Sequence, residues 1–372
     1  MIDTIVLLLP SHYFTITQLN KFTPSAQFVY SHTLLRAVQN PLKQELKNGV
    51  YKPRLTLLRR ADMQGKQDVM LKIECSLPKL LLGNNFEELC YKDFAKIIEL
   101  LQTTLIEMGV QVSTDHLIKA DVIAIHYAKN IVLTDGSTPY GILKKIKQYK
   151  APASLDVNQT DYRNDGHAFK WHCNGYEVVF YDKIQDLGKA QKSSKRAIES
   201  DNEIQLHLFK KIQTMQYRKK FEMLRMEVRL SRRQKMQQLL SKLNITTPLT
   251  FDKLFKPAIS KKVLLHYVDL LQAQQTILFD FSSKGNDVAL FAALVVHNPG
   301  IAVTKIIQMF GLKKILESLS IPELKIMLKQ YNQRTLDRLF ADAYEINIGE
   351  FVQSNVFEEL RRQIEKGKVV KL

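Results

Sequence analysis

Hydrophobic and polar residues alternate over much of the first half of the chain, which predicts strands. Residues 5–9 are continuously apolar, and residues 68–77 alternate so that Val69, Leu71, Ile73 and Cys75 share one face. A period of two is typical of a strand that is buried on one face. Asn174-Gly175 is a strong signal for a tight hairpin turn between two such segments. Strands are therefore predicted at residues 5–9, 54–60, 68–77, 116–127, 169–173, 176–183 and 224–230.

Apolar residues at helical spacing predict helices that pack on this sheet and a second half that is helical throughout. In the first half, helices are expected at residues 86–108, 138–149 and 197–216. Beyond residue 231, proline and glycine separate short helical segments, among which a helix-turn-helix is one possibility. These segments are residues 232–243, 260–274, 286–298, 302–309, 312–319, 321–331 and 334–344.

This order of elements predicts an α+β protein. Residues 1–245 are expected to form a domain with an antiparallel sheet and packed helices. Residues 246–372 are expected to form an all-helical C-terminal domain.

Positive charge is concentrated in one part of the chain. The chain has 54 Lys and Arg against 37 Asp and Glu, a net charge of +17, and residues 186–262 hold 19 basic and 7 acidic residues. Such a segment favours a polyanion, because each neutralised phosphate releases condensed counterions. Nucleic acid is therefore the first expected partner. The residues expected to contact it are Lys189, Lys192, Lys195, Arg196, Arg225, Arg229, Arg232 and Arg233.

Cysteine usage and hydropathy predict a cytoplasmic protein that does not enter a membrane. Cys75, Cys90 and Cys173 are widely spaced and odd in number, which argues against a disulfide framework or a structural zinc site. The apolar opening of residues 1–10 is too short to span a bilayer and carries Asp3 where a signal peptide is positively charged. We interpret this opening as the first strand.

Acidic residues in otherwise apolar strands are the main candidates for metal chemistry. The sequence has no Walker loop, no Gly-x-Ser-x-Gly and no histidine pair separated by one apolar residue. Glu74, Asp121 and Glu227 remain, with Glu177 as a fourth acid. Buried carboxylates are costly unless they are paired or bind a cation, and their hard oxygens suit Mg²⁺ or Mn²⁺. Alternatively, each acid pairs with a nearby Lys or Arg.

Five short blocks of the sequence stand out in a fixed order along the chain. They are Met1-Ile-Asp-Thr-Ile-Val-Leu-Leu-Leu-Pro10, Leu71-Lys-Ile-Glu-Cys-Ser-Leu-Pro-Lys-Leu-Leu-Leu-Gly-Asn-Asn85, Ile118-Lys-Ala-Asp121, Phe180-Tyr-Asp-Lys183 and Leu224-Arg-Met-Glu-Val-Arg-Leu230. In this order the blocks resemble the gene II/X family of phage and plasmid replication proteins, which includes the filamentous-phage replication initiator. The resemblance covers about residues 1–240, and the helical remainder looks like that family's C-terminal domain.

The resemblance implies a rolling-circle replication initiator, an endonuclease that nicks one strand at an origin and later rejoins it. The family's nicking tyrosine matches Tyr181, and the basic residue after it matches Lys183. Attack by the phenol leaves a 5′-phosphotyrosyl bond and a free 3′-hydroxyl. The span from Trp171 to Tyr181 looks shorter than in the phage relative, so Tyr176 stays open as the nucleophile.

The expected partners and the alternative functions follow from the same residues. The initiator would bind origin DNA as duplex and as single strand, and a host helicase and polymerase are further candidate partners. Glu74, Asp121 and Glu227 match acidic positions of the family pattern, while their role as metal ligands is our own inference. The alternative is a DNA-binding regulator of a phage or plasmid without catalysis. A tyrosine recombinase or topoisomerase would need a cluster of Arg and His around Tyr181, which the sequence lacks.

Overall fold

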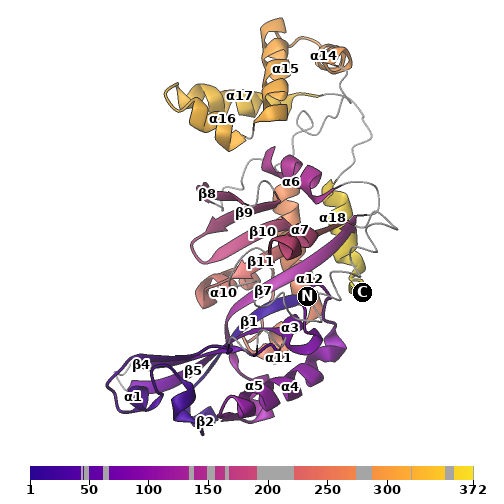
Figure 1. Cartoon of the computed structure of the whole chain (residues 1–372). Coiled ribbons are helices and arrows are strands. Elements are labelled where there is room, and N and C mark those ends of the chain that lie inside the picture. The colour runs from indigo at the N-terminus through magenta and orange to yellow at the C-terminus, as the bar shows by residue number, and fades with distance from the viewer. Residues whose placement is uncertain are drawn as a thin grey trace.

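The computed structural model describes most of the chain (Figure 1). It covers residues 1–42, 45, 50–61, 67–133, 138–148, 156–163, 167–190, 222–273, 287–319, 321–347 and 356–371.

Nine strands of the described chain form one antiparallel sheet, which confirms the predicted α+β class. A separate pair, β2 (Phe14–Ile16) and β6 (Val110–Val112), lies outside it. The order across the large sheet is β3 (Arg36–Gln39), β4 (Arg54–Ala61), β5 (Gln67–Ser76), β1 (Ile2–Leu9), β7 (Asp121–Leu133), β11 (Glu222–Leu230), β10 (Tyr176–Asp182), β9 (Ala168–Cys173) and β8 (Asp156–Arg163).

Alternation along the strands gives the sheet an apolar face and a polar face. On β5, every second residue from Val69 to Cys75 is buried, while Lys72 and Glu74 between them are half-buried. The predicted hairpin is confirmed: β9 pairs with β10, and Gly175 in the turn has φ +104°, a conformation that favours glycine.

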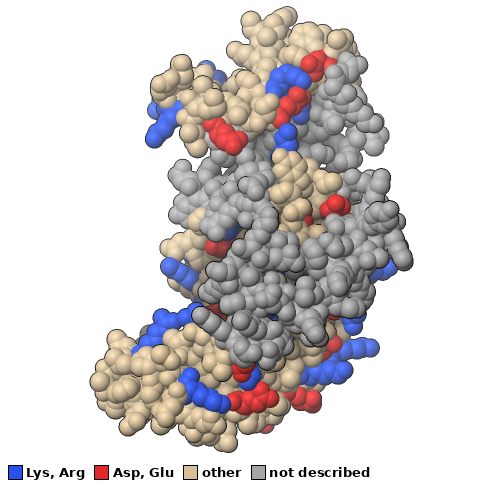
Figure 2. Space-filling view, in the orientation of Figure 1, with Lys and Arg blue, Asp and Glu red and all other residues tan. Residues whose placement is uncertain are grey.

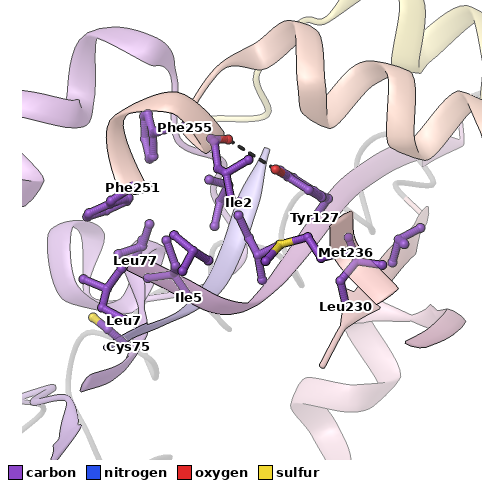
Figure 3. Packing of buried hydrophobic residues seen from close by; sticks show 14 of the residues in the cluster. Ile2, Ile5, Leu7, Cys75, Leu77, Tyr127, Leu230, Met236, Phe251 and Phe255 are labelled. Atoms are coloured by element: carbon purple, nitrogen blue, oxygen red, sulfur yellow. Dashed lines mark hydrogen bonds between the residues drawn. The ribbon is translucent and has the colours of Figure 1, made fainter. Parts of the chain in front are cut away.

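Helices from distant parts of the sequence cover the apolar face. In Figure 3, Phe251 and Phe255 lie in the same buried cluster as Ile5 and Leu7 of β1, and the Tyr127 hydroxyl donates to the carbonyl of Leu254 at 3.3 Å. Fully burying one such aromatic side chain stabilises the fold by about 1.5–3 kcal/mol. The elements around this sheet are α1 (Gln27–Tyr30), α3 (Leu77–Leu82), α4 (Phe94–Glu107), α5 (Thr114–Ile118), α6 (Pro139–Gln148), α7 (Lys183–Ala190), α10 (Arg233–Lys242), α11 (Phe251–Leu254), α12 (Pro257–Gln272) and α18 (Val356–Lys366).

The remaining helices have a hydrophobic core of their own, which includes Leu290, Met309, Leu316 and Phe340. Residues of α11, α12 and α18 belong instead to the core of the sheet. Residues on the C-terminal side of the predicted boundary near residue 245 therefore contribute to both cores. The helices of the second core are α14 (Asp287–Val296), α15 (Val303–Ser318), α16 (Ile321–Met327) and α17 (Gln333–Glu345).

Several predicted elements differ from the observed ones. The strand expected at 116–127 begins with α5, where the Ser113 side chain accepts the His116 amide and caps the helix, and the strand β7 starts at Asp121. The two helices expected around Gly311 form one helix, α15, because a single glycine costs only about 1 kcal/mol there. The predicted helix at 86–108 begins at Phe94, α18 was not predicted, and the helix at 197–216 lies outside the described residues. Within the described residues, no helix has both the length and the hydropathy needed to cross a membrane.

Candidate functional site

Tyr181 lies near the end of β10, where the sheet brings it next to β11. In the strand register it is opposite Arg225 of β11 and Ala168 of β9. Its hydroxyl donates a hydrogen bond to Oε1 of Glu227 at 2.9 Å. The ring is half-buried, so the phenol belongs to a polar cluster and does not end in bulk water.

Glu227 is held between two arginines of its own strand. Alternation along β11 places Arg225, Glu227 and Arg229 on one face, as the sequence predicts. Arg225 donates to Oε1 at 2.8 Å, and Arg229 donates twice to Oε2 at 2.9 and 2.7 Å. Burial opposes the charge of Glu227, but the two guanidinium groups outweigh it and lower the pKa of this carboxyl well below its ordinary value. Glu227 is therefore a carboxylate at neutral pH.

Arg225 connects four parts of the fold and is only 2% exposed. Besides Glu227, its guanidinium donates to a carboxylate oxygen of Asp3 in β1, to the main-chain oxygen of Asn85 and to Oδ1 of Asn130 in β7. A buried guanidinium needs acceptors for its N–H groups, and these neighbours together with Glu227 accept four hydrogen bonds from it. The pKa of Arg225 stays high, so its charge is permanent.

Lys183 begins α7 immediately after the strand that carries Tyr181. Its ammonium nitrogen lies 5.6 Å from the centre of the Tyr181 ring and donates to Oδ1 of Asn85 at 2.9 Å. The side chain is 1% exposed. Burial, and then repulsion from Arg225, lowers the pKa of Lys183 to about 8.

The environment keeps the phenolic proton of Tyr181 in place in this conformation. Burial raises the pKa of Tyr181 well above its ordinary value; Arg225 opposes this, while the negative charge of Glu227 adds to it. The hydroxyl is thus protonated, and its hydrogen points at a carboxylate. Such a pair can pass the proton on when a neighbouring charge changes.

The three predicted metal ligands do not come together. Glu74 on β5 faces Lys72 at 3.5 Å, and Asp121 at the start of β7 forms an ion pair with Arg233 at 3.0 Å. Glu227 lies on β11, the third strand from β5 in the sheet, with β1 and β7 between them. Throughout the described part of the chain, no three His, Cys, Asp or Glu side chains form a group that could hold a metal ion. These acids therefore do not fit a shared Mg²⁺ or Mn²⁺ ion.

Of the residues expected to contact DNA, Arg225 and Arg229 lie at the site itself. Arg233 pairs with Asp121, and Arg232 packs beside the turn at Gly175. Lys189 belongs to α7, while Lys192, Lys195 and Arg196 lie outside the described residues. On the side seen in Figure 2, the described Lys and Arg side chains occur at several separate places, next to Asp and Glu.

Four residues of the cluster were not predicted: Asp3, Asn85, Asn130 and His126. His126 of β7 is opposite Arg229 in the register, and burial followed by repulsion from Arg229 lowers its pKa. Asp3 and Asn130 did carry a signal, because each is a polar residue inside an apolar run of a strand. Asn85 stands in a loop, and its role depends on a contact that sequence spacing does not reveal.

Comparisons with protein-family models, with curated proteins and with solved structures found no match. The resemblance to the gene II/X family therefore stays a prediction that rests on the residues themselves.

Proposed function

We propose that this protein is a rolling-circle replication initiator that nicks one DNA strand through Tyr181 and later rejoins it. One observation carries the proposal: the Tyr181 hydroxyl donates to Glu227, and two arginines surround the same carboxylate. A nucleophile, a proton acceptor and fixed positive charge are the groups that transfer of a phosphodiester to a phenol requires.

In the proposed step, the phenolic oxygen of Tyr181 attacks the phosphorus of a phosphodiester. The phenolic proton passes to Glu227, the bond between phosphorus and the 3′ oxygen breaks, and the 3′ alkoxide takes a proton from water. The products are a 5′-phosphotyrosyl bond and a free 3′-hydroxyl. Attack of a 3′-hydroxyl on the phosphotyrosine reverses the step and rejoins the strand without consuming a nucleotide.

Arg229 explains how Glu227 can become basic enough to accept the proton. Its side chain is 33% exposed, whereas that of Arg225 is 3% exposed, so Arg229 is the cation that an incoming phosphate can reach. A phosphate that takes Arg229 away from Glu227 removes one of the two charges that lower the pKa of this carboxyl. The same arginine then neutralises the phosphate under attack.

Lys183 supplies further positive charge beside the ring of Tyr181. With a pKa of about 8 it is mostly protonated at pH 7 and loses its charge in mildly alkaline solution. A fixed ammonium near the reacting oxygen stabilises negative charge that develops there.

The test is covalent capture of DNA by matched tyrosine variants. The full-length protein is incubated with a random-sequence pool of single-stranded oligonucleotides that carry a 3′ label, and adducts are separated in denaturing gels. We expect adducts with the wild type and with Tyr176→Phe. The ring centre of Tyr176 lies 6.0 Å from that of Tyr267. Tyr181→Phe should bind the pool and form no adduct; an adduct with this variant would contradict the proposal.

The alternative is a DNA-binding regulator without catalysis. It is favoured by the ion pairs that surround Glu227, because the same network would serve as a structural connection between strands. A regulator would bind the pool and form no adduct with any of the three proteins.

A further inference from the structure

The segment 83–90 contains the Gly-Asn-Asn sequence that ends the second block of the resemblance. Gly83 ends α3 with φ +70°. The side chain of Asn84 accepts the amides of Phe86 and Glu87 at 2.9 and 3.0 Å and donates to the carbonyl of Leu82 at 3.0 Å. Asn84 thus fixes the turn from within and leaves Asn85 at a set position.

Asn85 contacts both buried cations of the candidate site. Its main-chain oxygen accepts from Arg225 at 3.0 Å, and its side-chain oxygen accepts from Lys183 at 2.9 Å. Arg225 and Lys183 repel one another, so a shared acceptor between them holds them at a fixed separation beside Tyr181.

The loop of residues 83–90 binds the part of β7 that extends beyond its pairing with β1. The pairing of β1 with β7 ends at Tyr127, although β7 continues to Leu133. Beyond this point the amide of Asn130 donates to Glu88 at 2.6 Å, and the Asn130 side chain donates to the carbonyl of Phe86 at 2.6 Å. Buried backbone groups need such partners, so the loop takes the place of a strand.

The backbone of residues 368–370 fastens the loop from the other side. The amide of Val370 donates to the Glu88 side chain at 3.2 Å, and the amide of Glu88 donates to the carbonyl of Val370 at 3.0 Å. Lys129 donates to Glu88 and to the carbonyl of Lys368, both at 2.6 Å. Glu88 and Lys129 are buried, so the ion pair between them forms away from water.

We propose that Asn85 is a positioning residue for Arg225 and Lys183, and that the backbone at 368–370 holds it there through Glu88. The inference rests on the proposed function, and it gives the segment after α18 a part in the nicking site. Chain movements that loosen this segment would then lower the nicking rate without removing any group that touches DNA.

The variant Val370→Pro tests the attachment because it deletes the N–H that Glu88 accepts. Lys371→Pro is the matched control, since no hydrogen bond from its amide is seen among the described residues. The measured quantities are the rate of adduct formation at saturating oligonucleotide, the affinity for the oligonucleotide, and the protonation midpoint of Lys183. This midpoint comes from reductive methylation of the full-length protein between pH 6.5 and 10.5, followed by mass spectrometry of the peptide with residue 183.

We expect Val370→Pro to slow adduct formation by about ten- to a hundredfold at unchanged affinity, as small misplacements of catalytic groups do. Its Lys183 midpoint should move upward from about 8, because water reaches the ammonium group once Asn85 is free to leave. The charged groups that act on Lys183 are Arg225, Asp186, Asp3 and Glu227, its ring neighbour is Tyr181, and this variant alters none of them. Lys371→Pro should match the wild type.

Unchanged rate and unchanged midpoint in a folded Val370→Pro protein would overturn the inference. If fluorescence of Trp171 shows that this variant does not fold, Asn85→Ala decides instead, with the same expected changes and the same contrary result. Should the wild type form no adduct, the proposed function fails, while the Lys183 midpoint still decides whether Asn85 and residue 370 set the position of this ammonium group.

Discussion

Replacing Glu227 by glutamine removes the charge that both arginines share and keeps the shape of the side chain. Glu227 is 3% exposed and accepts bonds from Arg225, Arg229 and Tyr181. Removing one partner of a buried ion pair costs about 3–5 kcal/mol. Arg225 keeps Asp3 as a counter-charge, and Arg229 is partly exposed and can be hydrated. We therefore expect Glu227→Gln to lower the free energy of unfolding by about 3 kcal/mol, at the lower end of that range.

Urea unfolding followed by fluorescence measures this loss directly. Trp171 is the only tryptophan of the chain and is buried against Phe169 and Phe180 in the core of the sheet, so its signal reports on this part of the molecule. The control is Glu74→Gln, the same substitution at a half-exposed glutamate whose ion pair with Lys72 spans 3.5 Å. A surface pair of this kind contributes about 0–1 kcal/mol.

The pH dependence provides a second check on Glu227. Its pKa is lowered in the folded protein from an ordinary 4.5, so the unfolded chain takes up the proton first as the pH falls. The stability difference between wild type and Glu227→Gln should be full above pH 4.5 and shrink below it. Equal losses for the two glutamine variants at pH 7, or a difference that grows in acid, would refute the account of the buried network.

Three further predictions concern other residues of the site and the core. Glu74→Gln and Asp121→Asn, alone or combined, should change the rate of adduct formation by less than about threefold, because each acid forms only a surface ion pair. A large loss of rate in the adduct assay would restore the predicted role of these two acids in catalysis. The pKa of Lys183 is lowered from 10.5 to about 8, so as the pH rises the folded protein loses the Lys183 proton before the unfolded chain does. Between pH 8 and 10.5, urea unfolding should therefore show the stability of the wild type rising relative to that of Lys183→Met. Stability curves of the two proteins that stay parallel over this pH range would contradict the prediction. Burial raises the pKa of Cys75 to about 12, so maleimide at pH 8 should label Cys90 and Cys173 before it, as peptide mass spectrometry can show.

The strands could be predicted from the sequence because one face of the sheet is buried. The alternation in residues 68–77 and 224–230 identifies β5 and β11, and it correctly places Arg225, Glu227 and Arg229 on one face. The helix at 114–118 was missed because it is short and has only two apolar residues, Leu117 and Ile118, too few to show a helical period, and only the cap at Ser113 marks it.

The composition of the site depended on strand order, which the sequence does not reveal. Tyr181 and Glu227 meet because β10 lies directly beside β11 in a register that pairs Val179 with Glu227. Glu74 and Asp121 are also acids in strands, but β5 and the start of β7 place them elsewhere, where Lys72 and Arg233 neutralise them. Residue type alone could not separate these cases, since all three acids have a basic neighbour within reach.

Mapping the covalent adduct on the wild-type protein tests the central claim most directly. After incubation with the single-stranded oligonucleotide pool, nuclease and protease digestion leaves a peptide that carries a nucleotide linked through its 5′ phosphate. Tandem mass spectrometry then identifies the modified residue. The account predicts this modification on the phenolic oxygen of Tyr181, which lies 2.9 Å from Glu227. A modification on Tyr176 or on any other residue, or no modified peptide at all, would contradict it.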